Sequence, residues 1–356
     1  MLNNVHQLFY MSCRTVRRPL IYTSFIKRRC YSAAAISQQQ QQEKQRSNLN
    51  VIDFFDPDLS IPPHHYTLKC GVSGYAKAGK QVDPQEHNIY TSVQVGDDSY
   101  FQRNDALGVA DGVGGWRSHT GANPALYSLK LMHYAQLELD RIKSNVRPYH
   151  VPQNLPNPVE ILESAYHLTT LDAQNEGIVG STTACIVVLC HDELRVANLG
   201  DCGISVIRKN NYIFRSEEQQ HSFNFPYQLG TASFDTPMDA QQFTIKVEEG
   251  DIMILGSDGL FDNLYDDEIM EEVQNCMQQV PEQDLNKTST MQSISEALAF
   301  RAKVVSEDVE NPTSPFQVRA MHEGLYYQGG KADDISVLVA LVQRDEKPGP
   351  TPPPLP

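Results

Sequence analysis

Aspartates stand at the ends of several short apolar runs, where their carboxylates could bind a metal ion. Asp111 closes the run Ala106–Ala110 and is followed at once by a glycine-rich turn. Asp258 follows a second apolar run, and Asp333 with Asp334 opens a third. Carboxylate oxygens are the ligands that Mg²⁺ and Mn²⁺ prefer. One Asp-Gly pair alone is better explained as a hairpin turn, but three such sites in one chain favour a metal centre.

The chemistry that such a centre would perform is hydrolysis. Two divalent ions held a few ångströms apart lower the pKa of a water between them and clamp a phosphoryl oxygen. Asp97 and Asp98, which precede the apolar run before Asp111, add two more carboxylates. The sequence has no G-x-S-x-G elbow, no Cys-His signature, no Walker A loop and no D-x-D-x-D-G calcium loop. Hydrolysis of a phosphate ester by metal-activated water is therefore the simplest enzymatic interpretation.

The strands that must carry these aspartates are short and separated by turn residues. The sequence predicts a strand at Tyr66–Tyr75 and another at 101–110 that leads to Asp111. The run 183–190 is apolar throughout, which indicates a central strand buried on both faces. Turn residues after it predict a β-meander that continues to residue 215. Further strands are expected as a pair at 243–247 and 252–255, and as a last strand at 335–342.

Helices are predicted in two separate pairs. Asn123-Pro124 and Asn157-Pro158 are good N-cap and first-turn residues, and each begins a segment with helical apolar spacing. The first helix is expected to end near Arg141 and the second at Gly177. The later pair is expected at 266–277 and 288–305, and 306–331 is expected to be a loop. Strands in meanders with two helix pairs indicate an α+β protein with sheets in the middle and helices outside.

Composition limits the class of partner. The chain has 356 residues, 40% of them hydrophobic, and a formal net charge of −15, which argues against a nucleic-acid partner. No stretch of 18 uninterrupted apolar residues occurs, so we expect no transmembrane segment. The sequence does not indicate an oligomeric state.

The termini differ from the middle of the chain. Residues 1–37 contain six Lys or Arg residues and no acidic residue, which is typical of a mitochondrial transit peptide; a disordered basic tail is the alternative. Arg29-Cys30-Tyr31-Ser32 is similar to a presequence cleavage site. We expect a linker at 38–63, the folded domain at 64–346, and a disordered Pro-rich tail at 347–356.

Five motifs together resemble one known family. D-G-V-G-G-W, G-S-T-T-A, A-N-L-G-D, G-S-D-G-L-F-D and A-D-D-I-S occur in this order and are similar to the metal-dependent protein phosphatases of the 2C (PPM) type. Q-Q-H-S-F-N-F-P-Y-Q-L narrows the resemblance to a branch of mitochondrial matrix phosphatases with fungal and animal members. The resemblance implies a central β-sandwich of two antiparallel sheets flanked by helix pairs, in α-β-β-α layers.

The resemblance also implies roles for individual residues. Asp111 would bridge two Mn²⁺ or Mg²⁺ ions, Gly112 would offer its carbonyl oxygen to one, and Asp258 with Asp333 would hold the other. Asp98, together with Asp97, would act through metal-bound water. The catalytic set is thus Asp98, Asp111, Asp258 and Asp333.

A looser third metal is also implied by the resemblance. Asp201 and Asp262 match the acids near it, although Asp201 is equally well explained as a hairpin-turn residue. Ser181 and Thr182 match a structural turn that supports the backbone.

Two positions depart from the family pattern. Many members carry an Arg that grips the phosphate where this chain has Val93, so that Lys77, Lys80 or Arg103 would have to replace it. Many also carry a His as leaving-group acid where this chain has Val113.

The function implied is hydrolysis of phosphoserine and phosphothreonine in proteins of the mitochondrial matrix, coenzyme Q biosynthesis enzymes among them. The two departures leave an alternative open, a catalytically weak pseudophosphatase that binds phosphoproteins. Retention of the metal aspartates argues against it, because clustered carboxylates are costly.

Overall fold

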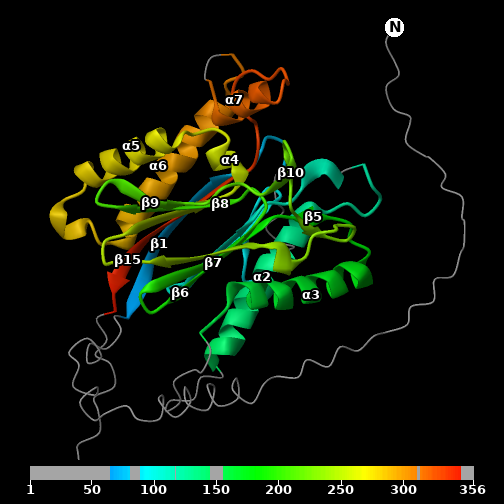
Figure 1. Ribbon diagram of the computed structural model, residues 1–356, viewed down its shortest axis with the longest axis horizontal. Helices are drawn as coiled ribbons and strands as arrows, with labels where there is room; N and C mark the ends of the chain where they lie inside the picture. The colour runs from blue at the N-terminus through cyan, green and yellow to red at the C-terminus, as the bar shows by residue number, and fades with distance from the viewer. Residues whose placement is uncertain (1–64, 81–88, 117, 145–154, 311–312, 346–356) are drawn as a thin grey trace, which may run out of the picture. The chain divides into compact units, whose positions relative to one another are not determined.

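The computed structural model describes residues 65–80, 89–116, 118–144, 155–310 and 313–345. The expected leader, linker and Pro-rich tail lie outside these residues. Within the described part, two antiparallel sheets are stacked face to face, and helices cover both outer faces (Figure 1). The predicted α-β-β-α sandwich is therefore confirmed.

The first sheet has five strands and places the ends of the domain side by side. The strand nearest the N-terminus pairs along its whole length with the last one, from Tyr66 with Arg344 to Tyr75 with Ile335. The order across the sheet is β1 (Tyr66–Tyr75), β15 (Ile335–Arg344), β14 (Ile252–Gly256), β8 (Gly203–Arg208) and β9 (Asn211–Arg215).

The second sheet has six strands. Its order is β13 (Gln241–Lys246), β7 (Glu193–Leu199), β6 (Ala184–Cys190), β4 (Ala106–Ala110), β3 (Asp98–Gln102) and β2 (Val93–Val95). Two short pairs lie outside these sheets, namely β5 (Ser181–Thr182) with β12 (Leu229–Gly230) and β10 (Gln220–Ser222) with β11 (Phe225–Pro226). The described residues also include three short 3-10 helices in connections: η2 (Gly114–Trp116), η3 (Pro237–Asp239) and η4 (Glu282–Asp284).

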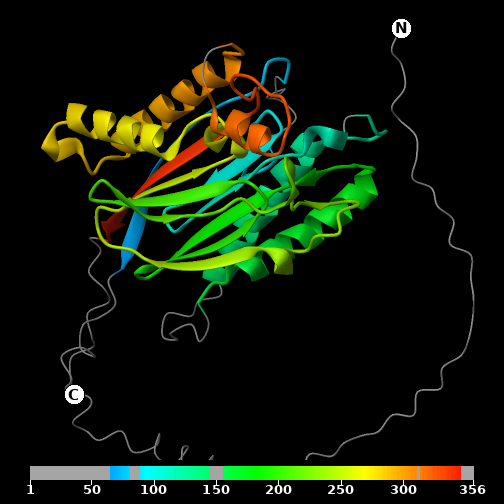
Figure 2. The ribbon, with the colours of Figure 1, turned by 45° about the horizontal axis from the view of Figure 1, so that its top comes forward.

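The helix pairs cover opposite faces of the sandwich. α2 (Pro124–Ser144) and α3 (Pro158–Glu176) pack on the six-stranded sheet, and α5 (Asp266–Gln279) and α6 (Thr288–Glu307) on the five-stranded one. Figure 2 shows the same layers from another side, with the yellow α5 and the green α3 on opposite sides of the strands. Two further helices, α4 (Asp258–Phe261) and α7 (Pro315–His322), flank the edge where the aspartates gather.

The core consists of three apolar layers, and strand alternation assigns each side chain to one of them. In β6, Ile186 and Val188 face α2 and α3, whereas Cys185 and Val187 face the opposite sheet. β15 does the same: its odd-numbered apolar residues from 337 face the second helix pair and the even-numbered ones face the sandwich interior. This double burial explains why both strands are apolar throughout.

The helix starts follow the local signals in the sequence. Asn157 accepts a hydrogen bond from Val159 N at 3.0 Å, and Gly177 adopts a left-handed φ of 69° after the last helical turn. Asn123 accepts a hydrogen bond from Leu126 N at 3.0 Å at the start of α2. The two predicted caps and the glycine stop are therefore confirmed.

Four predictions about the connections are wrong. The expected strand at 101–110 is a hairpin, β3 and β4, because the chain turns at 103–105. The expected meander at 183–215 is split, since β6 and β7 belong to one sheet and β8 and β9 to the other. The strands at 241–246 and 252–256 likewise lie in different sheets rather than pairing. The expected loop at 306–331 contains α7. Between β7 and β8, and again between β13 and β14, a short turn crosses from one sheet to the other. The turn residues alone do not distinguish such a crossing from a hairpin.

Candidate metal centre

The strands that precede or follow the aspartates all end at the same edge of the sandwich. In the six-stranded sheet the ends meet in the pairs Ser99–Ala110, Val109–Cys185 and Ala184–Leu199. In the five-stranded sheet they meet at Gly203–Gly256 and Gly256–Val337. The turn at 200–202 joins the two sheets at this edge. Residues far apart in the chain therefore converge at one place because antiparallel register fixes where each strand stops.

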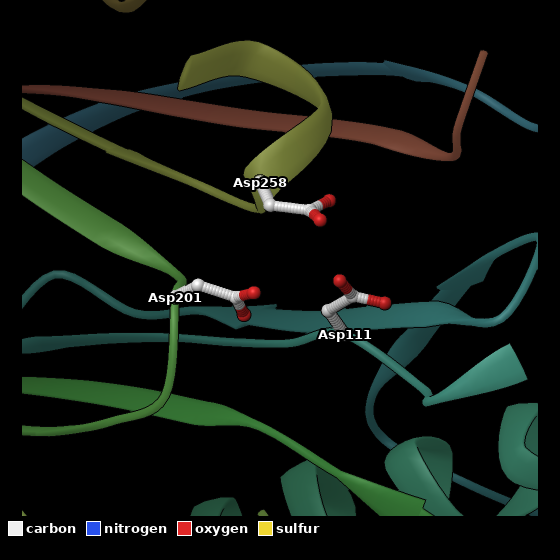
Figure 3. A group of neighbouring side chains, drawn as sticks. All are labelled: Asp111, Asp201 and Asp258. Carbon is white, nitrogen blue, oxygen red and sulfur yellow. The ribbon is translucent and has the colours of Figure 1, made fainter. Parts of the chain in front are cut away.

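Three carboxylates form the centre of the site. Asp111, Asp201 and Asp258 each offer an oxygen atom, and these oxygens lie within 4.8 Å of one another. Figure 3 shows the three side chains pointing toward one another from three separate segments. Asp201 is thus part of the cluster at a crossing between sheets, and the hairpin interpretation of this residue is wrong, because β7 and β8 do not pair.

Several of the acidic oxygens are buried with no partner. Among the described residues, Oδ1 of Asp201, Oδ1 of Asp258 and both carboxylate oxygens of Asp98 have no hydrogen-bond partner. Asp98 is only 1% exposed. A buried carboxylate without a partner is costly unless a cation or a proton neutralises it. The site therefore fits divalent metal ions, whose charge and oxygen preference match these vacant acceptors.

Mutual repulsion within the cluster has a clear electrostatic signature. Burial raises the pKa of Asp111 well above its ordinary value, and the charges of Asp258, Asp98 and Asp333 raise it further. Burial also raises the pKa of Asp98, with the charge of Asp334 as the next cause. Such shifts mean that the carboxylates repel one another when no cation is bound. Metal ions would remove this repulsion.

Asp333 and Asp334 have different surroundings. Asp333 is partly exposed, and its oxygens lie 3.4 Å from Lys331 Nζ and 3.8 Å from Lys77 Nζ. Asp334 is buried, and its Oδ2 accepts hydrogen bonds from Lys80 Nζ at 2.6 Å and from Asp97 N at 2.9 Å. Asp333 thus remains the candidate ligand of the pair, whereas Asp334 holds the neighbouring turn in place.

Asp97 belongs to this same support. Its Oδ2 lies 2.6 Å from Lys80 Nζ, so Lys80 is shared between Asp97 and Asp334. This ammonium group is therefore already neutralised by two carboxylates. Asp98, the next residue, is buried as well, and the charges of Asp334 and then Asp258 raise its pKa further.

Asp262 is held by cations of the protein itself. Its Oδ2 lies 2.5 Å from Lys331 Nζ, and its Oδ1 is bonded by Arg319, which also pairs with Glu218. Lys331 also bonds Asp258 directly. The two acids expected near a third metal thus have different direct partners: Asp201 lies beside Asp111 and Asp258, whereas Asp262 binds Lys331 and Arg319.

The backbone around Asp111 is fixed by the turn that follows α3. Thr182 Oγ1 donates to the carbonyl oxygen of Asp111 at 2.8 Å, and Thr183 N donates to the same oxygen at 2.9 Å. Gly112 lies so close to the chain that an added Cβ would be 2.5 Å from the carbonyl oxygen of Asp97. Support of the backbone by the Ser-Thr turn is thus confirmed, and only glycine fits beside it.

A cavity of about 720 Å³ opens over the carboxylates. Its wall includes Asp111, Asp201, Asp258 and Asp333 together with Lys77, Lys80, Val113, Trp116, His119 and Lys331. Trp116 Nε1 donates to Ser181 Oγ at 2.6 Å, and Ser181 Oγ donates to Gln228 Oε1 at 2.5 Å, so the wall is tied to the strand turn below it. This size is typical of a ligand site.

Of the three cations considered as substitutes for the missing arginine, one is misplaced. Arg103 lies in the turn at the far end of the β3–β4 hairpin, where it pairs with Asp105 and Asp140. It therefore does not face the acidic cluster. Lys77 and Lys80 both line the cavity, and Lys77 is the more exposed of the two.

Fold and site together define a class, and the chain belongs to the protein phosphatase 2C family. Residues 106–343 match the model of the family described as "Stage II sporulation protein E (SpoIIE)". The chain is 39% identical over 291 residues to the zebrafish "Protein phosphatase PTC7 homolog", covering 78% of this chain and 90% of that protein. The human protein of the same name is 38% identical over 69% of this chain and 79% of its own length.

Plant relatives and a solved structure agree with this assignment. The Arabidopsis "Probable protein phosphatase 2C 80" is 38% identical over 69% of this chain, and the chain spans 54% of that protein's length. The chain thus spans about half the length of the plant relatives that it matches. The photosystem II phosphatase PBCP is 31% identical with a TM-score of 0.61, covering 78% of this chain and 99% of that one.

Sequence reasoning missed three residues that shape the site. Lys331 stands two residues before Asp333, so its proximity could have been noticed. Arg319 lies on α7, which was expected to be a loop, and Glu218 lies in an irregular stretch after β9. No spacing rule connects these three residues, because their meeting depends on the packing of α7 beside the sheet edge.

Proposed function

We propose that this chain is a metal-dependent phosphatase that hydrolyses phosphoserine and phosphothreonine in proteins. The observation that carries the proposal is the group of three carboxylate oxygens within 4.8 Å of one another in the wall of a cavity of about 720 Å³. Membership of the protein phosphatase 2C family supports it.

Two Mn²⁺ or Mg²⁺ ions would be held by Asp111, the carbonyl of Gly112, Asp258 and Asp333, with Asp98 and Asp201 as further acidic support. When bound, such ions lower the pKa of a water between them and polarise the phosphoryl oxygen.

The protein's own cations would orient the substrate. Lys77 lines the cavity with 39% of its side chain exposed, so its ammonium group can approach a phosphate dianion. Lys80 is occupied by Asp97 and Asp334 and would instead hold the turn that presents Asp98. We therefore assign phosphate attraction to Lys77 and support of the turn to Lys80.

A second candidate function is favoured by one specific observation. Val113 lines the cavity at the position where a leaving-group acid is expected, and Val93 lies 47% exposed on β2 rather than in the cavity wall. A pseudophosphatase that binds phosphoproteins without cleaving them would tolerate both changes. A pseudophosphatase would not need buried carboxylates without partners, which are costly to the folded protein. For this reason the pseudophosphatase is the second candidate.

The substitution Asp111→Asn tests the proposal. We expect it to lower turnover of phosphothreonine and phosphoserine peptides by at least about a hundredfold, as removal of a central electrostatic group does. Wild-type turnover should vanish in excess chelator and return with Mn²⁺. Removal of the carboxylate should also relieve repulsion, so the metal-free variant should melt no lower than the metal-free wild type.

Asp105→Asn is a matched control for this experiment. It changes the same residue type at the opposite end of β4, where Asp105 pairs with Arg103 and Lys143. We expect wild-type metal dependence and turnover. Full turnover in excess chelator, or an active Asp111→Asn variant, would contradict the metal mechanism, whereas phosphopeptide binding without any turnover would favour the pseudophosphatase.

We further propose that the protein acts in the mitochondrial matrix. The support is the basic, acid-free segment 1–37 of the sequence. The resemblance to matrix phosphatases extends the proposed substrates to matrix proteins, including coenzyme Q biosynthesis enzymes. N-terminal sequencing of protein from purified mitochondria should find a start near Tyr31-Ser32, and an intact Met1 in mature protein would exclude cleavage there.

A further inference from the structure

One cation lies inside the acidic site and has no part in the proposed reaction. Lys331 Nζ bonds Asp258, lies 2.5 Å from Asp262 Oδ2 and lies 3.4 Å from Asp333 Oδ2. Its side chain is only 13% exposed. Two of these three carboxylates are predicted metal ligands on the proposed function, and the third is the acid expected near a further metal.

Neighbouring groups hold the backbone of Lys331 and flank its ammonium group. Lys331 N donates to Asn263 Oδ1 at 2.9 Å, and Asn263 Nδ2 donates back to the carbonyl oxygen of Lys331 at 2.9 Å. Asn263 is itself 1% exposed and lies one residue after Asp262. The ammonium group also lies 5.0 Å from the ring centroid of Phe316. Lys331 is thus a built part of the site rather than a surface side chain resting on it.

The remaining oxygen of Asp262 is also engaged. Arg319 bonds Asp262 Oδ1 and continues to Glu218, so both oxygens of the Asp262 carboxylate bind cations of the protein. Asp201, by contrast, has a buried Oδ1 with no hydrogen-bond partner among the described residues. Both oxygens of Asp262 are therefore bonded by cations of the protein, whereas Oδ1 of Asp201 is not.

We propose that Lys331 is a resident cation that takes the place of a third metal ion between Asp258, Asp262 and Asp333. This inference rests on the proposed two-metal function and adds to it. A divalent ion at the position of the ammonium group would meet the positive charge of Lys331, whose backbone is held by Asn263 and whose ammonium group lies beside Phe316. The chain should therefore bind two ions and exclude a third. Asp262 should form an ion pair with Lys331 and should not be a metal ligand.

The test counts bound metal directly. Metal-free wild type is dialysed against increasing Mn²⁺, and free Mn²⁺ is measured by electron paramagnetic resonance. We expect two ions per chain for the wild type. Lys331→Met, which keeps the length of the side chain but removes its charge, should bind a third and weaker ion, whereas Lys331→Arg should again bind two.

Two further variants make the result specific. Lys77→Met removes an ammonium group from the same cavity at 3.8 Å from Asp333 and should leave the count at two. Asp262→Asn in the Lys331→Met background should abolish the third ion. Melting temperatures with and without Mn²⁺ show that each variant is folded, and Lys331→Met should gain more stability from Mn²⁺ than the wild type does.

The possible failures are distinguishable. If Asp111→Asn binds as many ions as the wild type, the proposed metal centre itself is wrong. If Asp111→Asn loses binding but the wild type binds three ions, or Lys331→Met still binds only two, then the metal centre stands and the role of Lys331 is overturned. A third ion in Lys331→Met that persists in the double variant would also overturn it, because Asp262 would not be its ligand.

Discussion

At the scale of single residues, the site is defined by what surrounds each carboxylate rather than by the number of acids. Asp111, Asp201 and Asp258 face one another, whereas Asp334 and Asp97 share the ammonium group of Lys80. Adjacent aspartates in the sequence thus serve different purposes. A carboxylate oxygen bonded by an ammonium group is held by the protein, whereas a buried oxygen without a partner, such as Oδ1 of Asp258, is available to a metal.

Val113 leads to a prediction about substrates. An alkyl leaving group benefits from a proton donor by on the order of a hundredfold or more, whereas an aryl oxygen needs little help. His119 lines the same cavity, but its Nδ1 lies 3.2 Å from the carbonyl oxygen of Trp116. We therefore expect the wild type to prefer aryl phosphates over phosphoserine peptides, and Val113→His to raise phosphoserine turnover more than aryl turnover.

The measurement is kcat/KM for both substrate types at saturating Mn²⁺. Val93→His is the control, because Val93 lies on β2 and does not line the cavity. Val93→His should leave kcat/KM unchanged for both the aryl phosphate and the phosphoserine peptide. Equal effects of Val113→His on both substrates, or a wild type without aryl preference, would mean that another acid already protonates the leaving group.

At the scale of elements, the tight turn between β2 and β3 packs against Asp334, which precedes β15. Gly96, between β2 and β3, has a φ of +66°, and a Cβ there would lie 1.9 Å from Asp334 Oδ1. The same aspartate accepts hydrogen bonds from Lys77 N at 2.7 Å and from Lys80 Nζ at 2.6 Å. Close approach of the turn to Asp334 thus positions Asp98 and the lysine segment together.

Gly96→Ala should therefore damage metal binding as well as stability. The left-handed φ alone costs about 1–2 kcal/mol for alanine, and the clash should displace Asp334 and with it Lys80. Gly177→Ala is a matched control, since its φ is +69° and nothing lies within 4 Å of the added Cβ. Urea unfolding should show a loss of about 1–2 kcal/mol for the control and more for Gly96→Ala.

Mn²⁺ titration then separates the two effects. Only Gly96→Ala should require a higher Mn²⁺ concentration for half-maximal stabilisation. If both variants bind Mn²⁺ as the wild type does, Asp334 does not transmit the position of the turn to the metal ligands.

At the scale of the whole molecule, the acidic cluster makes stability depend on pH and metal together. Burial, followed by the charge of Asp262, raises the pKa of Glu218 from 4.5 to about 7. Burial also raises the pKa values of Asp201 and Asp258. An acid with a raised folded-state pKa binds more protons when folded than when unfolded. Stability is then highest below the unfolded pKa and falls as the pH rises toward the folded pKa.

The metal-free protein should therefore lose stability between about pH 4.5 and pH 7, and saturating Mn²⁺ should flatten this dependence. Glu218→Gln should remove part of the loss, on the order of 1–3 kcal/mol. Glu217→Gln, one residue earlier and exposed, is the control and should leave the profile unchanged. The measurement is urea unfolding in chelator across this range. A metal-free stability that rises with pH would contradict the prediction.

The sequence by itself determined the elements that carry the aspartates. Apolar runs and Asn-Pro starts predicted strands such as β1 and helices such as α3, because these signals are local and act through backbone geometry. Motif order predicted the family and the set of acids, since residue types at strand ends are readable without coordinates. In this sense the chemistry of the site was present in the sequence.

Only the tertiary structure decided which acids meet in the cluster and which are paired with cations of the protein. The turn at 200–202 crosses between sheets instead of closing a hairpin, which brings Asp201 to Asp111 and Asp258. Arg103 points to the far end of its hairpin, and Lys331 with Arg319 occupies Asp262. These outcomes depend on which strands pair and how α7 packs, and such long-range contacts leave no periodic signal in the chain.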